Sequence, residues 1–328
     1  MKVAIIGLGS VGKGVATMLA KKDLGIQVTG IADSRSGIIN PAGINIGEML
    51  ALKQKSGMCG SNGITADDVV KKADYDILIE VSPTNALTGE PATDYIRTAL
   101  GRKKHVVTSN KGPIALAFHD LRELARENGV ALRYEATVAG AIPIMHTLEH
   151  GLAGNEIIAL YGVLNGTCNF ILTRMADEGL TYEQALMEAR EMGYAEADPT
   201  YDVQGIDAAI KLVILANTIW DNGIKLSDVD RTGIDLLTAD ALRLAEEEGC
   251  TIRLIAEAMP RKKLIRVSPR ILPKNHPLVV EGTLNALTLE TDLAKEITLI
   301  GRGAGSIETA SAIIGDLLYI RDRYVQRT

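Results

Sequence analysis

The feature that most limits the fold of this chain is a glycine-rich turn close to its N-terminus. Residues 7–12 read Gly-Leu-Gly-Ser-Val-Gly, directly after the β-branched run 3–6 and directly before a helical pattern at 13–22. Glycines at this spacing permit a tight strand-to-helix turn and the close approach of a pyrophosphate. We therefore predict a dinucleotide site at the start of this helix. The residues expected at the phosphates are Gly7, Gly9, Ser10, Val11 and Gly12.

Two kinds of side chain could select the cofactor at the ribose. Asp33 ends the second strand-like run, where a carboxylate can accept the ribose hydroxyls of NAD. Arg35, together with Lys53 or Lys55, could instead neutralise the 2′-phosphate of NADP. Because the sequence carries both sets, the preference between NAD and NADP stays open.

The N-terminal part alternates short apolar runs with helical patterns, which is typical of an α/β fold. We predict a Rossmann-type, doubly wound parallel sheet in a dinucleotide-binding domain of residues 1–132, with the apolar helical segment 304–328 returning to cover it. The expected strands are 3–6, 27–32, 77–81, 105–108 and 131–135. The expected helices are 13–22, 46–55 and 118–128.

The character of the sequence changes after Gly140. Longer helical patterns at 143–151, 181–192 and 207–218 are mixed with strand candidates at 157–164 and 264–269. This pattern predicts a second, α+β domain of residues 133–303, which contains the candidate substrate-binding and catalytic stretch 196–211 considered below. Three prolines there, Pro269, Pro273 and Pro277, indicate turns or sheet edges rather than a central strand.

Composition and charge indicate which class of partner the chain binds and in which cellular compartment it works. A chain of 328 residues with 46% hydrophobic content can bury the cores of two domains. The net charge of −6 is spread over segments of mixed sign, so we expect a small-molecule partner and no nucleic-acid surface. No apolar run reaches the ~18–20 residues of a membrane span, and Met1 leads straight into a strand-like run without a signal-peptide pattern. We therefore predict a cytoplasmic protein.

The three cysteines indicate a reducing compartment. Cys59, Cys168 and Cys250 have neither the spacing of a metal knuckle nor the even count of a disulfide framework. Cys168 lies in a polar stretch, but a small buried thiol is commoner than a nucleophile, so we give it no catalytic role.

Two segments carry candidate catalytic side chains. The run 108–111 ends a strand, and open parallel sheets bind ligands beyond the carboxyl ends of their strands, which places Lys111 near the cofactor. Further on, an acidic stretch from Glu196 to Asp202 leads into Asp207 and Lys211, which are four residues apart and share one helix face. So many carboxylates near one lysine repel each other unless a positive partner binds, as a substrate ammonium would.

Taken in their joint order, these segments resemble the homoserine dehydrogenase family along nearly the whole chain. The segments that carry the resemblance are 7–12, 108–111, 135–138, 165–167, 193–211, 301–305 and 309–310. The resemblance implies an NAD(P)-dependent oxidoreductase that interconverts L-homoserine and L-aspartate 4-semialdehyde, a step toward threonine and methionine. It also implies a homodimer formed through the second domain, without the regulatory C-terminal domain of some relatives.

The resemblance further implies roles for individual residues. Lys211 would be the proton donor and acceptor, Asp207 and Glu196 would bind the amino-acid substrate, and Lys111 would lie beside the nicotinamide and the reacting oxygen. The remaining expected cofactor contacts are Ser82, Ser109, Gly193 and Gly303. A sodium ion would be held largely by backbone carbonyls of Glu135, Val138, Gly140 and Ile142.

The sequence departs from the family pattern at two places. Arg302 stands where a proline is common, and Ala139-Gly140 varies the loop after Val138. Neither departure removes a side chain with an expected catalytic role.

Three alternatives need separate tests. Residues 146–150 read His-Thr-Leu-Glu-His, which fits a zinc-binding helix, although five residues match such a pattern readily by chance. An aspartate-semialdehyde dehydrogenase needs an acylating cysteine with a base, and Cys168 has no obvious histidine partner. A nucleotide-binding sensor would need neither Lys211 nor its carboxylates.

Overall fold

The structure is a computed structural model that describes residues 1–325, and it divides into two compact units. The first unit is Met1–Pro143 together with a C-terminal segment that starts at Ala304, and the second is Ile144–Gly303. The first unit thus extends beyond the expected boundary at residue 132, because Asp316 of the returning segment binds Arg133 and the backbone N–H of Glu135. Residues 326–328 of the expected segment lie outside the described residues.

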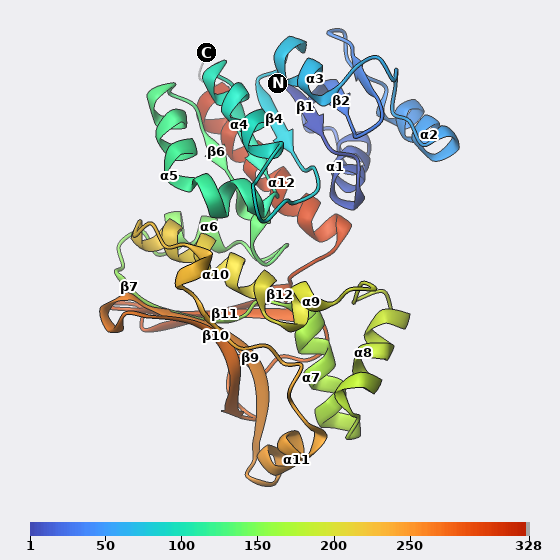
Figure 1. Cartoon of the computed structure of the whole chain (residues 1–328). Helices are drawn as coiled ribbons and strands as arrows, with labels where there is room; N and C mark the ends of the chain where they lie inside the picture. The colour runs from blue at the N-terminus through green and yellow to red at the C-terminus, as the bar shows by residue number, and fades with distance from the viewer. Residues whose placement is uncertain (326–328) are drawn as a thin grey trace. The chain divides into compact units, whose positions relative to one another are not determined.

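The first unit contains a six-stranded sheet in the order β3-β2-β1-β4-β5-β6 (Figure 1). The strands are β1 (Lys2–Ile6), β2 (Gln27–Ala32), β3 (Gly37–Ile39), β4 (Ile77–Glu80), β5 (His105–Thr108) and β6 (Leu132–Arg133). All neighbours are parallel except β3, which pairs antiparallel with β2 at one edge. The predicted Rossmann-type parallel sheet is confirmed.

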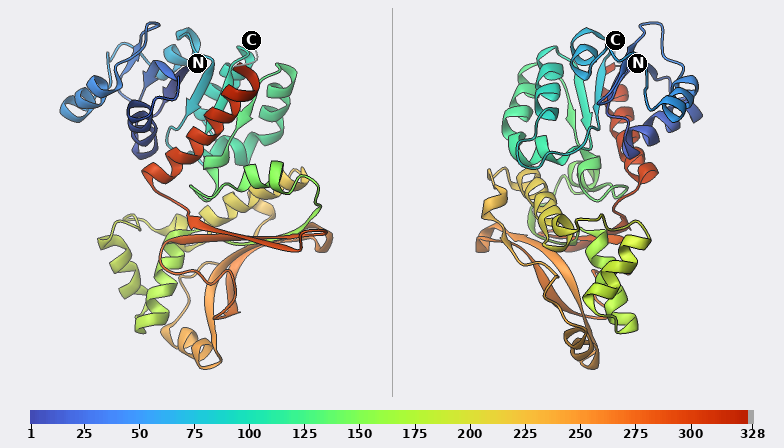
Figure 2. Two further views of the ribbon diagram at one scale, coloured as in Figure 1. Left: turned by 180° about the vertical axis from the view of Figure 1, so that it is seen from behind. Right: turned by 45° about the vertical axis from the view of Figure 1, so that its right-hand side comes forward.

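Helices cover both faces of this sheet, because alternate residues of each parallel strand point to opposite faces and both sets are apolar. On β1, Val3 and Ile5 pack with α1 (Ser10–Lys21) and α12 (Ser306–Ile320), whereas Ala4 and Ile6 pack on the opposite side. That side is covered by α3 (Ala66–Lys72), α4 (Ala92–Gly101) and α5 (Lys111–Glu127). Figure 2 shows α12 in red lying along the sheet, although it comes from the opposite end of the sequence.

Three elements of the first unit differ from the sequence prediction. Helix α5 begins at Lys111 rather than at 118, since Pro113 is tolerated in the first turn of a helix, where its missing N–H leaves no bond unmade. The strand expected at 131–135 shortens to β6 because the chain turns into the 3-10 helix η1 (Glu135–Thr137). Helix α1 starts three residues before the expected 13–22, at Ser10.

The second unit contains another six-stranded sheet, in the order β12-β11-β7-β9-β10-β8. Its strands are β7 (Ile157–Val163), β8 (Asp230–Arg231), β9 (Cys250–Met259), β10 (Leu264–Pro273), β11 (Leu284–Thr291) and β12 (Glu296–Arg302). All pairs are antiparallel except β10 with β8. Because β8 pairs only with Arg266 and Val267, Pro269 and Pro273 lie beyond that paired stretch, as expected for prolines at a sheet edge.

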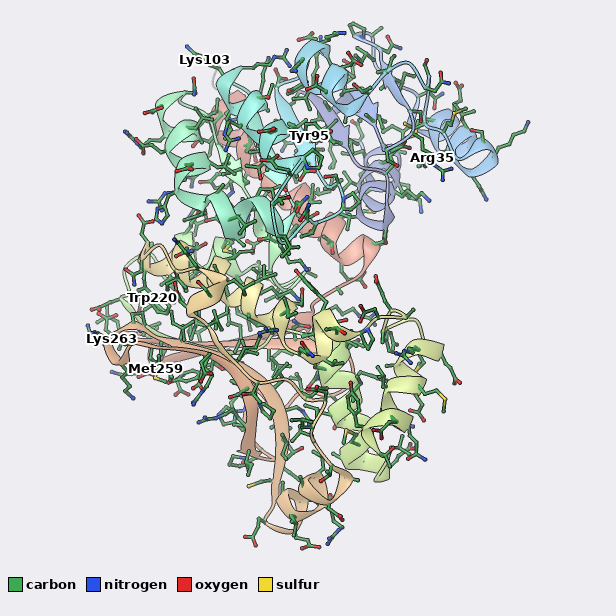
Figure 3. All side chains as sticks on the ribbon, viewed as in Figure 1. Arg35, Tyr95, Lys103, Trp220, Met259 and Lys263 are labelled. Carbon is green, nitrogen blue, oxygen red and sulfur yellow. The ribbon has the colours of Figure 1, made fainter. Side chains whose placement is uncertain are left out.

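One helix of the second unit is buried along most of its length. Every residue from Asp207 to Asn217 of α10 (Ile206–Trp220) is buried. Trp220, which is labelled in Figure 3, ends this helix, and its indole N–H donates to the Ile157 carbonyl. The others are α6 (Ile144–His146), the π-helix η2 (Thr147–Gly151), α7 (Gly166–Glu178), α8 (Tyr182–Glu191), α9 (Thr200–Val203) and α11 (Ala239–Glu247). The helix expected at 143–151 is present from Ile144 to Gly151, although its residues from Thr147 onward form a π-helix rather than an α-helix.

Within residues 1–325, no helix is both long and apolar enough to cross a bilayer.

Candidate active site

The glycine-rich turn joins β1 to α1 and combines close packing with open space. Gly7 has a φ of +101°, and a Cβ there would lie 2.5 Å from the carbonyl oxygen of Val81. A Cβ on Gly12 would collide with the Gly7 carbonyl oxygen. At Gly9, in contrast, a Cβ would meet no atom of the described residues within 4 Å. Two glycines thus allow tight packing and the third leaves room at the positive end of α1, which fits a pyrophosphate.

At the expected ribose position, Asp33 is engaged on both of its oxygens. One oxygen accepts hydrogen bonds from the backbone N–H groups of Arg35 (2.7 Å) and Ser36 (3.0 Å), and the other pairs with the Lys53 ammonium at 2.6 Å. Burial acts to raise the pKa of Asp33, but the hydrogen bond from Lys53 and those from the backbone outweigh it and lower that pKa overall. Of the two lysines considered, the ion pair is formed by Lys53, from α2 (Ile46–Ser56).

Arg35 lies close to the same α2 segment (Figure 3). A Cβ on Gly57, the residue that ends α2, would lie 3.5 Å from an Arg35 guanidinium nitrogen. Lys53 Nζ donates to the Gly57 carbonyl oxygen at 2.6 Å. Arg35, from the Asp33 loop, and Lys53, from α2, therefore place two cations near the Asp33 carboxylate.

The other expected cofactor contacts of the first unit follow the carboxyl ends of two adjacent strands. Ser82 lies two residues beyond β4, and Ser109 directly follows β5. Lys111 is the first residue of α5, whose N-cap Asn110 accepts a hydrogen bond from the Gly112 N–H. All three lie at the edge of the sheet where open α/β folds bind ligands.

The expected sodium loop is a tight reversal of the chain. Val138 follows η1, and the next two residues, Ala139 (φ 56°) and Gly140 (φ 52°), both have positive φ. Ile142 closes the turn by donating its N–H to the Ala139 carbonyl at 3.0 Å. Glu135, at the other end, donates its N–H to Asp316.

In the second unit, α10 carries a buried ion pair. Asp207 and Lys211 lie one helical turn apart, and Lys211 Nζ is 2.7 Å from an Asp207 carboxylate oxygen. Both residues are buried, at 5% and 8% exposure, and Lys211 also donates to the Leu164 carbonyl at 2.7 Å. A lysine so desolvated and held by one carboxylate is a candidate for proton transfer.

Sequence reasoning missed the residue that organises this pair. Asn165 caps α7 by accepting from the Cys168 N–H at 2.8 Å, and its amide nitrogen donates to Asp202 (2.7 Å) and to Asp207 (3.0 Å). One side chain therefore joins two carboxylates to the start of a helix. The signal was available, because an asparagine before Gly-Thr is typical of a helix N-cap.

The acidic stretch is less crowded than the sequence suggested. Asp198 turns to the backbone of α9, where a hydrogen bond from Thr200 lowers its pKa, and Glu196 and Gly193 are exposed. The loop that carries them is held by the carbonyls of Tyr194 and Ala197. Asn165 thus links Asp202 to Asp207, whereas Glu196 lies in the exposed part of the stretch.

Two further residues have clear surroundings. Gly303 follows β12, and a Cβ there would collide with the Asn285 amide unless that side chain moved. Cys168 is fully buried, and its burial together with the charges of Asp202 and Asp207 raises the pKa of its thiol well above the usual value. A thiol kept protonated is a poor nucleophile, in keeping with a structural role.

The histidine pattern at residues 146–150 lacks the geometry of a zinc site. The rings of His146 and His150 are 6.0 Å apart between centroids, and His150 Nε2 is 3.8 Å from a Glu149 oxygen. Among the residues that the structure describes, no group of three or more His, Cys, Asp or Glu side chains could hold a metal ion. The zinc interpretation gains no support.

Comparison with protein families identifies both units. A family model described as "Homoserine dehydrogenase, NAD binding domain" matches residues 7–135, and one described as "Homoserine dehydrogenase" matches residues 143–318. Together with the Rossmann-type sheet, these matches define an NAD(P)-dependent oxidoreductase.

Individual relatives agree along the full length. A homoserine dehydrogenase of Methanocaldococcus jannaschii is 45% identical, with 98% of each chain covered. An NAD(+)-dependent homoserine dehydrogenase of Pseudomonas canavaninivorans is 38% identical over 97% of this chain and 96% of its own.

Solved structures agree as well. A putative homoserine dehydrogenase from Archaeoglobus fulgidus is 49% identical with a TM-score of 0.92, covering 98% of this chain and 99% of its own. A mutant hyperthermophilic archaeal homoserine dehydrogenase in complex with NADPH is 30% identical with a TM-score of 0.84, covering 98% of each chain. The chain belongs to the homoserine dehydrogenase family.

Proposed function

We propose that the chain interconverts L-homoserine and L-aspartate 4-semialdehyde with NAD(P), a step toward threonine and methionine. The observation that carries the proposal is the buried ion pair of Lys211 with Asp207, at 2.7 Å. The printed names of the relatives support the same reaction. A buried ammonium held by one carboxylate and one backbone carbonyl can exchange a proton with a small polar substrate.

The chemistry accounts for a lysine at this position. Reduction of an aldehyde develops negative charge on its oxygen, which an ammonium stabilises and then protonates. Lys211 would donate this proton, and in the reverse direction it would take the proton of the homoserine hydroxyl. The nicotinamide, when bound, supplies or accepts the hydride.

The remaining roles divide between charge recognition and positioning. Glu196 and Asp207 would bind the α-ammonium of the substrate, since carboxylates are its natural partners. Lys111 would lie beside the nicotinamide and the reacting oxygen. Because the two lysines belong to different units, each role needs its own test. The proposed cofactor contacts are Gly7, Gly9, Ser10, Val11, Gly12, Ser82, Ser109, Lys111, Gly193 and Gly303.

For the cofactor, we propose that NADP binds more tightly than NAD. The Asp33 carboxylate is already occupied by Lys53 and by two backbone N–H groups. Arg35 and Lys53 leave one net positive charge around that carboxylate, which favours a 2′-phosphate over a hydroxyl.

We retain the sodium ion as a proposal. The carbonyls of Glu135, Val138, Gly140 and Ile142 would bind it, because the turn at Ala139 and Gly140 brings these residues into one loop. Exchange of sodium for the bulky N-methyl-D-glucamine cation should lower the thermal stability of the first unit, whereas an unchanged melting temperature would contradict the proposal.

The homodimer formed through the second unit and the cytoplasmic location also remain predictions.

The test of the reaction is homoserine-dependent reduction of NAD and of NADP by the purified chain, in separate assays at matched cofactor concentrations. We expect an increase in reduced-nicotinamide absorbance with at least one cofactor. Detectable cofactor binding without any reduction would favour a different substrate or the nucleotide-sensor alternative.

A further inference from the structure

A carboxyl group that the proposed chemistry does not use lies at the centre of the first sheet. Glu80 is the last residue of β4, between β1 and β5, and its exposure is 0%. Burying a carboxyl among apolar strands is costly, and a well-packed apolar side chain at such a position is often equally or more stable. Its presence therefore calls for a reason other than stability.

The Glu80 carboxyl bridges the ends of two strands. One oxygen accepts hydrogen bonds from the Ser82 backbone N–H at 2.9 Å and from the Ser82 hydroxyl. The other accepts from the Thr108 hydroxyl at 3.2 Å. The turn that follows β4 is thus fastened to the end of β5 through one side chain.

The same network continues to the start of α5. The Thr108 hydroxyl accepts from the Asn110 N–H at 2.9 Å, and the Asn110 amide nitrogen donates to the Ser82 carbonyl at 3.2 Å. Asn110 also caps α5, whose first residue is Lys111. Glu80 is therefore connected, through two hydrogen bonds, to the backbone that sets the position of Lys111.

The network also reaches the glycine-rich turn. A Cβ at Gly7 would lie 2.7 Å from the Ser82 nitrogen, so the Ser82 turn packs directly on the turn that follows β1. Three turns at the carboxyl edge of the sheet meet around Glu80. In doubly wound folds this edge, where the strand order changes direction, is where the dinucleotide binds.

We propose that Glu80 is a positioning residue that holds the Ser82 turn and the Thr108–Lys111 turn in the arrangement needed at the nicotinamide end of the cofactor. This inference rests on the proposed function for the identity of that end. Burial raises the pKa of Glu80, while the hydrogen bonds from Ser82 and Thr108 act in the opposite direction, so its partners offset part of the cost of burial. The free-energy cost of burial that remains is consistent with a residue whose role is to fix the geometry of the two turns.

The test compares four variants of the full chain. Glu80→Ala removes the bridge, and Glu80→Gln keeps its shape and can still accept from the Ser82 N–H. Thr108→Val removes the hydroxyl that links Glu80 to β5 and that accepts from the Asn110 N–H, but leaves the bond of Glu80 to Ser82 in place. Thr29→Val is the control, because Thr29 is also buried in this sheet and its hydroxyl binds the Asp74 carbonyl instead. Each variant is measured for its melting temperature, ADP affinity, NADPH affinity and kcat.

ADP separates positioning from general damage, because it contains the adenine and pyrophosphate part of the cofactor but no nicotinamide. For Glu80→Ala and Thr108→Val we expect kcat to fall at least ~10-fold while ADP affinity stays within about twofold, since small misplacements near reacting atoms are costly. Glu80→Gln should recover part of kcat. Thr29→Val should lower only the melting temperature.

Two results would overturn the inference. One is a kcat for Thr108→Val and for Glu80→Gln that equals the kcat of Thr29→Val. This comparison tests the positioning role even if Glu80→Ala does not fold. The other is equal weakening of ADP and NADPH binding, which would indicate a purely structural role. If the unaltered chain binds NADPH but does not oxidise homoserine, the proposed reaction fails separately, and the ratio of NADPH to ADP affinity in the variants still tests Glu80.

Discussion

The glycine-rich turn of the first unit and the cluster around Lys211 in the second unit are built in different ways. The turn is one contiguous stretch, residues 7–12, and its features are backbone conformation and the space left by missing side chains. The cluster is assembled from Leu164, Asn165, Asp202, Asp207 and Lys211, which come from the end of one strand region and from three helices.

Because of this difference, the two sites should be sensitive to different kinds of substitution. A backbone site is damaged by adding an atom where none was, whereas a side-chain site is damaged by removing one partner of a buried group. The predictions below test whether the two sites behave in these contrasting ways.

The largest expected effect concerns the long-range support of the first unit. Asp316 of α12 is fully buried and lies 3.0 Å from Arg133 Nε. Asp316→Ala should lower the free energy of unfolding of this unit by about 3–5 kcal/mol, because it breaks a buried ion pair and removes the acceptor of the Glu135 N–H. The chain's single tryptophan, Trp220, belongs to the second unit, so its fluorescence does not report on the first. Hydrogen–deuterium exchange in urea measures the stability of the first unit by itself.

The control for this variant is Asp322→Ala, which removes an exposed partner of Arg321 near the same end of the chain and should change stability by less than ~1 kcal/mol. Equal exchange rates in the two variants would contradict the view that the first unit depends on α12.

The next effect tests the backbone site itself. Gly9→Ala adds a methyl group where the structure has open space, so the fold should be unaffected. The same methyl group would occupy the expected place of the pyrophosphate, and we expect cofactor affinity to fall about 100-fold, or about 2.7 kcal/mol. Isothermal titration with NADPH measures it. A loss of thermal stability without a loss of affinity would mean that Gly9 serves only the turn.

A smaller effect is expected when the side-chain site loses its connecting residue. Asn165→Ala removes the amide shared by Asp202 and Asp207, and kcat should fall about 10-fold, or about 1.4 kcal/mol. Asn165→Asp keeps the helix cap but adds a negative charge, which stabilises a nearby ammonium in its protonated form. Homoserine oxidation should then require a higher pH.

Thr181→Ala is the matched control, since Thr181 caps α8 and its loss should affect stability alone. If all three variants share one pH profile and one kcat, Asn165 is only a helix cap.

The smallest effect sharpens the cofactor proposal. Arg35→Ala should weaken NADP about fivefold, or about 1 kcal/mol, and leave NAD nearly unchanged, because one exposed cation contributes modestly. Parallel titrations with the two cofactors measure the ratio. Lys55→Ala is the control, because the ion pair with Asp33 is formed by Lys53. An equal loss for both cofactors would place Arg35 away from the 2′-phosphate.

The parts of the molecule that were predictable are those encoded locally. The alternation of apolar runs and helical patterns located β1, β2, β4 and β5, and the glycine spacing located the tight turn between β1 and α1. The Asp207–Lys211 pair was also predictable, since residues four apart share a helix face.

The parts that were missed depend on partners that are distant in sequence. The strands β9, β11 and β12 gain their stability from pairing across a sheet, and no periodic pattern distinguished them beforehand. Asn165 and Glu80 act through residues 37 and 28 positions away, at Asp202 and Thr108. The early start of helix α5 was also missed, and its first turn contains Pro113, at a position where a helix tolerates proline.

The most direct measurement of the central claim is the kcat of Lys211→Arg beside that of Lys211→Ala. Arginine keeps a positive charge near Asp207 but does not give up its proton in proteins. We predict that both variants bind NADPH like the unaltered chain and lose at least ~100-fold in kcat, whereas Lys262→Ala, an exposed lysine of the same unit, loses nothing. A kcat for Lys211→Arg close to that of the unaltered chain would contradict the account, because charge alone would then suffice.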